Sequence, residues 1–135
     1  MGYWRRGAAL IFSGWPQEGL ADLQTSLRLD PRGSDLATRL TQVAAGYYFL
    51  RAYEDAAGAA EHAIRSFPEY PLHYRWLAAA LGQLDRIEEA KDALEKYITI
   101  APGSFDMYVR DRVPWIRAED HAHMLEGLRK AGWEG

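Results

Sequence analysis

The chain has 135 residues, which suits one domain in the usual range of about 100–200 residues. Its 48% hydrophobic and 26% charged residues are typical of a globular protein and exclude disorder throughout. The absence of cysteine excludes disulfides, thiolate metal sites and cysteine nucleophiles, and a net charge of −3 offers no basic surface for nucleic acid.

Helices are predicted along the whole chain. Alanine, the best helix former, is abundant, whereas valine and isoleucine, which favour strands, are few. Pro16 suits the first turn of a helix, Asp85 and Glu88 have capping-box spacing, and Gly132 suits a helix end. From these signals we expect helices at residues 2–13, 16–29, 36–51, 53–66, 71–83, 86–99, 104–111 and 118–131.

No predicted helix suits a membrane. The longest apolar stretch, residues 43–50, is far shorter than the ~20 residues that cross a bilayer. A short apolar run follows Arg5 and Arg6, but no small-residue cleavage site comes after it. We therefore expect a cytoplasmic protein without membrane insertion.

Residues of matching type recur with a period near 34. The first step is 37 residues, because three residues are inserted around residues 33–36, and the second is 34. Three sets share one phase each: the small residues Gly7, Ala44 and Ala78, the small residues Gly19, Ala56 and Ala90, and the prolines Pro31, Pro68 and Pro102. Such periods are typical of helical repeats.

The pattern resembles the tetratricopeptide repeat (TPR) family. In that family small residues lie where the two helices of a repeat touch, and a proline follows the second helix. The resemblance implies an all-α, right-handed helical solenoid as a single domain over residues 1–135. It would comprise three helix–turn–helix repeats at about 1–33, 37–70 and 71–104, and a two-helix C-terminal cap at about 105–135.

The order of the repeats, the insertion at residues 31–35 and the tail at residues 125–132 are also similar to another group of proteins. These are the C-terminal helical regions of bacterial class III adenylate/guanylate cyclases. That similarity implies a place in a larger bacterial signalling protein. The catalytic aspartates of a cyclase are not present in this chain.

No motif predicts catalysis. The chain has no phosphate-binding glycine motif and no nucleophile elbow. His121 and His123 are two residues apart, so on a helix they face different directions and do not form a metal pair. We expect solvated or half-buried histidines, no enzyme activity, no metal and no cofactor.

Recognition is the function that the sequence favours. In the family, the first helix of each repeat lines the concave side of the solenoid, and Trp, Tyr and Arg are enriched at binding hot spots. The predicted partner-binding face comprises Thr41, Gln42, Tyr48, Phe49, Arg75 and Trp76. The module would bind a protein or peptide, with an extended or helical apolar segment as the ligand. The alternative for Phe49 and Trp76 is that they only pack against neighbouring repeats.

A second surface competes with the groove. Trp4, Ile11 and Phe12 would form an apolar edge on the first repeat, to be covered by upstream chain or by a second copy in a homodimer. On this alternative the chain is an oligomerisation or regulatory spacer domain of a nucleotide cyclase, without a peptide ligand. The sequence leaves open whether the groove or the edge is the working surface.

Overall fold

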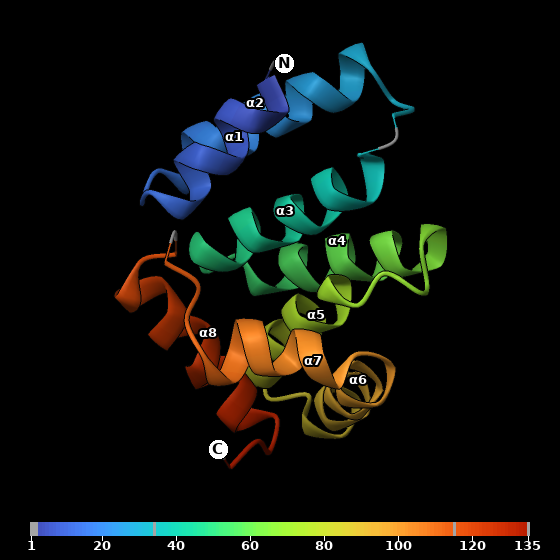
Figure 1. The fold of residues 1–135 in the computed structure, drawn as a ribbon, viewed down its shortest axis with the longest axis vertical. Coiled ribbons are helices and arrows are strands. Elements are labelled where there is room, and N and C mark those ends of the chain that lie inside the picture. Colours follow the sequence, from blue (N-terminus) through green and yellow to red (C-terminus); the bar gives the residue numbers. More distant parts are fainter. Residues whose placement is uncertain (1–2, 34, 115, 135) are drawn as a thin grey trace.

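The computed structural model describes residues 3–33, 35–114 and 116–134, with only the backbone given for residues 3 and 4. All regular elements in these ranges are helical, as the sequence predicts (Figure 1). The helices are α1 (Tyr3–Phe12), α2 (Pro16–Leu29), α3 (Leu36–Phe49), α4 (Tyr53–Ser66), α5 (Leu72–Gln83), α6 (Ile87–Ile100), α7 (Pro102–Phe105), the π-helical turn η1 (Asp106–Arg110) and α8 (Ala118–Lys130). The main difference from expectation is at residues 104–111, where the predicted single helix is a short α-helix followed by a π-helical turn.

The turn inside each helix pair has the same backbone geometry three times. Gly14, Arg51 and Asp85 each have a left-handed φ, of 94°, 63° and 64°, and they are spaced by 37 and then 34 residues. After each of them, an N–H bonds a carbonyl five residues earlier: Trp15 to Leu10, Ala52 to Tyr47 and Arg86 to Leu81. The predicted spacing is therefore present in the backbone. The predicted capping box is wrong, because Asp85 lies in this turn and makes no side-chain bond to the start of α6.

Glycines allow α1 and α2 to touch. A Cβ on Gly7 would come within 2.7 Å of the Gly19 carbonyl oxygen, and a Cβ on Gly19 would meet the Gly7 carbonyl oxygen in turn. Beside this contact, the Arg6 guanidinium binds both carboxylate oxygens of Asp22, at 2.6 and 2.9 Å. This pairing, chiefly its hydrogen bond, lowers the pKa of Asp22. The small residues thus lie at the helix contact, as the repeat pattern predicts.

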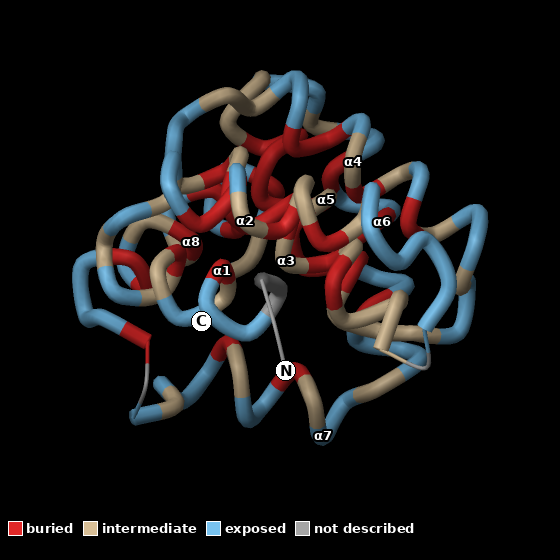
Figure 2. The backbone as a smooth tube through the Cα atoms, turned by 90° about the horizontal axis from the view of Figure 1, so that it is seen from above, coloured by how far each residue is buried: buried red, intermediate tan, exposed pale blue. Residues whose placement is uncertain are grey.

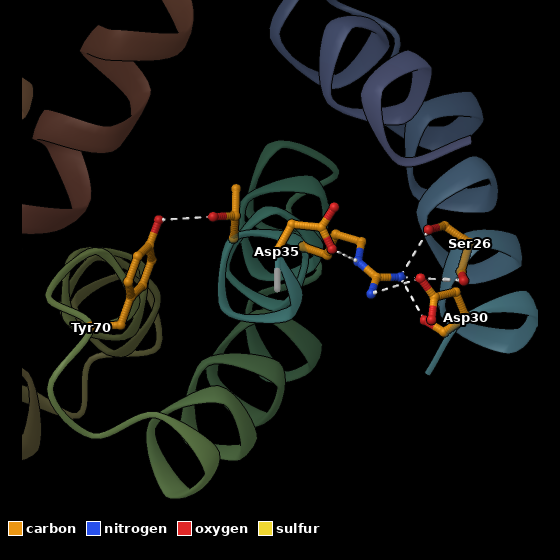
Figure 3. Close-up of polar contacts among 6 residues, drawn as sticks. Ser26, Asp30, Asp35 and Tyr70 are labelled. Carbon is orange, nitrogen blue, oxygen red and sulfur yellow. Dashed lines mark hydrogen bonds and ion pairs between the residues drawn. The ribbon is translucent and has the colours of Figure 1, made fainter. Parts of the chain in front are cut away.

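A buried arginine joins α2 to α3. Arg39 is 1% exposed, and its Nη1 donates to the Ser26 hydroxyl at 3.0 Å and to the Asp30 main-chain carbonyl at 2.8 Å. Its Nε lies 3.0 Å from the carboxylate of Asp35 (Figure 3). A Cβ on Gly33 would come within 2.8 Å of the same guanidinium. Asp30, Gly33 and Asp35 therefore lie around the Arg39 guanidinium, at and beside the predicted insertion.

Helices α1, α3 and α5 form a continuous row. Consecutive helices pack in pairs, and α1, α3 and α5 also contact one another in turn, whereas contacts among α2, α4 and α6 are weaker. We call α1, α3 and α5 the first-helix row. The buried residues gather where α3, α4 and α5 meet (Figure 2). Many of them are alanines, which let the helix backbones approach closely.

The C-terminal helix folds back onto this row. In the predicted cap segment, α8 packs chiefly against α5 and only weakly against α6. Gly82 and Gly127 make this possible, because a Cβ on Gly82 would meet the Gly127 carbonyl oxygen. Gly132 ends α8 with a left-handed φ of 106°, as predicted. The C-terminal helix α8 therefore covers part of the predicted partner-binding face.

Candidate binding site on the first-helix row

Four of the six residues of the predicted partner-binding face are buried by the chain itself rather than exposed: Thr41, Tyr48, Arg75 and Trp76. Tyr48 and Trp76 are both fully buried, so their expected exposure is wrong. The Tyr48 hydroxyl donates to the main-chain carbonyl of His123 on α8, and its ring lies 4.4 Å from the imidazole of His123. Gly127 allows this approach, because a Cβ there would meet Tyr48 and Ala79. The position of α8 accounts for the burial of Tyr48.

Aromatic rings connect the three repeats along the first-helix row. Phe12 on α1 meets Phe49 on α3 edge to face, with ring centroids 6.0 Å apart. Phe49 meets Trp76 on α5 in the same way, at 5.3 Å. Such pairs stabilise packing by about 0.5–1.5 kcal/mol each beyond the area they bury. Phe49 and Trp76 therefore do pack against neighbouring helices, which was the alternative to a binding role. Of the two, only Phe49 remains partly exposed.

The described residues of the predicted self-association edge do not form an exposed apolar surface. Ile11 is fully buried against Leu20, Leu23 and Val43, because it points into the contact of α1 with α2 and α3. Its assignment to an exposed edge is wrong. Phe12 is half-buried, and the side chain of Trp4 lies outside the described part of the structure.

An open groove separates α1 from α3. It has a volume of about 390 Å³ and is lined by Ala8, Ala9, Phe12, Ser13 and Gln42. We call it the inner groove. Ala8, Ala9 and Phe12 form apolar walls, and Ser13 and Gln42 add polar groups. Gln42 is one of the predicted site residues.

A smaller cavity adjoins the inner groove, with Phe12 and Gln42 as shared walls. Its volume is about 170 Å³, and we call it the Arg75 cavity. Its lining comes from α1, α3, α5, η1 and the turn before α5: Phe12, Thr38, Thr41, Gln42, Tyr70, Leu72, Arg75, Trp76 and Tyr108. Four of the six predicted site residues, Thr41, Gln42, Arg75 and Trp76, therefore line one cavity, although their spacing in the sequence did not predict an enclosed space.

Arg75 is the charged group of this cavity. Only 3% of it is exposed, although a charged residue was expected on an open face. Its guanidinium lies 4.4 Å from the Trp76 ring and 5.0 Å from the Tyr108 ring, distances suited to cation–π contacts. Burial lowers its pKa, and nearby tyrosine side chains oppose that shift.

Another hollow lies away from the first-helix row, between α4, α5 and α6. Its volume is about 400 Å³, and its rim carries both signs of charge, with Glu61, Glu89 and Asp92 beside Arg65 and Lys96. The charges are solvent-facing or half-exposed. This mixed rim selects no particular ligand charge.

The histidines differ from expectation at two positions, His73 and His121, which are both buried. His62 is exposed and His123 half-buried, but His73 is fully buried and neither of its ring nitrogens has a hydrogen-bond partner. Burial lowers the pKa of His73 to about 4. No sequence pattern predicted this burial, because a lone polar histidine at the start of α5 is equally compatible with an exposed position. In the described part of the chain, no group of acidic or histidine side chains could hold a metal ion.

Comparison with known proteins adds no further identification. No protein-family model matches the chain, and no curated protein matches it in sequence. Among the helices formed by the described residues, none has both the length and the apolar character needed to cross a membrane.

Proposed function

We propose that this chain is a non-catalytic TPR-type interaction module that binds a protein segment in the inner groove. The observation that carries the proposal is the open space of about 390 Å³ between α1 and α3, two first helices of successive repeats. The turn geometry shared by Gly14, Arg51 and Asp85 supports the repeat architecture behind it. On the cyclase similarity, such a module would serve inside a larger signalling protein.

The walls of the inner groove indicate what it would bind. Ala8 and Ala9 leave room near the α1 backbone, Phe12 offers an aromatic surface, and Gln42 and Ser13 offer hydrogen bonds. An extended segment with one or two apolar side chains would fill this space and use the polar groups for its backbone. Arg75 and the buried Trp76 lie deeper, in the adjoining Arg75 cavity.

A steric block tests this assignment. Ala9 is exposed and lines the inner groove, so Ala9→Trp would fill it without disturbing the core. Ala21 on α2 is also exposed but lies outside the groove, so Ala21→Trp is the matched control. Peptides selected from a random library on the wild-type chain should lose binding to Ala9→Trp by about tenfold or more and keep it with Ala21→Trp. Equal binding to both variants would exclude the inner groove.

The same pair of variants addresses the self-association alternative. Of the predicted edge, Phe12 is the described residue that stays partly exposed, and it lines the inner groove. A homodimer through this edge would therefore use the same surface as a peptide. Light scattering that shows a wild-type dimer, and a monomer for Ala9→Trp, would favour the oligomerisation spacer over the interaction module.

A further inference from the structure

Arg75 is a buried cation for which the described residues supply no anion. None of them places a carboxylate against its guanidinium or accepts a hydrogen bond from it, and its Nε is buried without a partner. Its Cζ lies over the Trp76 and Tyr108 rings, 4.4 and 5.0 Å from their centroids. Ring faces attract the charge but do not accept the N–H groups in the guanidinium plane. Buried charges are normally paired and hydrogen-bonded, and among the described residues the Arg75 Nε has no such partner.

Two further polar atoms in the same cavity lack partners. The Thr41 hydroxyl and the Gln42 side-chain oxygen are both buried without a hydrogen bond. Thr41 can donate its O–H, and the Gln42 amide can turn to present its NH₂ group. By contrast, the hydroxyls of Thr38 and Tyr70 lie 3.3 Å apart and bond each other (Figure 3). The unpaired groups of Thr41 and Gln42 therefore line the same cavity as Arg75.

We propose that the Arg75 cavity binds a small organic monocarboxylate, with its carboxylate on Arg75 and its apolar body against Trp76 and Leu72. One guanidinium matches one negative charge and can donate two parallel hydrogen bonds to a carboxylate. The cavity volume of about 170 Å³ equals that of roughly six water molecules in the liquid, which suits a compact acid. The ligand goes beyond the proposed peptide function and does not depend on it.

Benzoate is the probe, and its neutral analogue benzamide is the control for charge. In ¹⁵N-resolved NMR of the full chain, millimolar benzoate should shift the Trp76 indole signal and the Thr41 amide but not the indole of Trp15, which is 57% exposed and outside the cavity. Benzamide should bind at least about tenfold more weakly. If the cavity holds only water, benzoate will not shift the Trp76 indole or the Thr41 amide signal, and that result would overturn the proposal. Equal binding of benzamide and benzoate would overturn it as well.

Two variants test whether Arg75 and Thr41 bind the carboxylate. Arg75→Met keeps the length of the side chain, removes the charge, and should weaken benzoate binding about tenfold or more. Arg28→Met, on the exposed end of α2, is the matched control and should leave the affinity unchanged. Thr41→Val removes one donor at constant shape and should weaken binding a few-fold, which keeps a test available if Arg75→Met does not fold. Benzoate binding that survives in a folded Arg75→Met variant, or that is unchanged in Thr41→Val, would refute the assignment.

Discussion

Acidification should destabilise the fold through His73. This side chain is fully buried against the ring of Tyr70, at 4.9 Å, and burial lowers its pKa from 6.5 to about 4. Well above pH 6.5 the imidazole is neutral in both the folded and the unfolded chain, so its protonation does not change the free energy of unfolding. Between about pH 6.5 and 4 the unfolded chain binds a proton that the folded chain does not, so stability falls as the pH falls.

The size of the effect follows from the two pKa values. Between pH 7 and pH 5, a group with a pKa of 6.5 unfolded and about 4 folded lowers the free energy of unfolding by about 2 kcal/mol. Urea denaturation followed by circular dichroism at a series of pH values measures this loss. Because the free energy of unfolding can depend on pH through more than one group, the comparison needs a variant without the imidazole.

His73→Leu provides that comparison, because leucine fills a similar volume and has no titratable group. The difference in unfolding free energy between wild type and His73→Leu should change by about 2 kcal/mol from pH 7 to pH 5, with the variant less sensitive to acid. Parallel pH curves for the two proteins would refute the reasoning, since the imidazole would then titrate as it does in the unfolded chain.

Two stability predictions concern the contact between α2 and α3 and the packing of α8 against α5. Arg39→Ala should lower the unfolding free energy by about 3 kcal/mol in urea denaturation, because the charged hydrogen bonds to Ser26 and Asp30 are lost; a loss below about 0.5 kcal/mol would contradict this. Gly127→Ala should cost about 1–3 kcal/mol, because its Cβ would meet the α5 backbone. Gly58→Ala, in open space on α4, should instead stabilise by about 0.5–1 kcal/mol. The same sign of change for both glycines would contradict the packing of α8 against α5.

The helices and their phase could be predicted from local patterns. Prolines at fixed phase mark the ends of second helices, and pairs such as Gly7 and Gly19 mark helix contacts, so the bounds agree with the structure within two residues for most helices. These signals lie within one repeat. They predict local structure because each helix presents one apolar stripe to its neighbour.

The site was harder to predict because distant segments build it. Tyr48 is buried by His123, which lies 75 residues further along the chain, and no local pattern indicates that α8 turns back onto α5. The charge of Arg75 suggested exposure, yet its guanidinium fits between Trp76 and Tyr108. Residue type therefore identified four of the cavity-lining side chains, whereas their enclosure depends on tertiary packing.

The most direct test of the account is to map a selected peptide on the ¹⁵N-labelled chain. A peptide that binds the wild type should shift the backbone amides of Ala8, Phe12 and Gln42, which line the inner groove, and leave those of Glu88 and Glu95 on α6 unchanged. Shifts confined to α2, α4 or α6, with the amides of the inner groove unmoved, would contradict the claim that the first-helix row carries the binding surface.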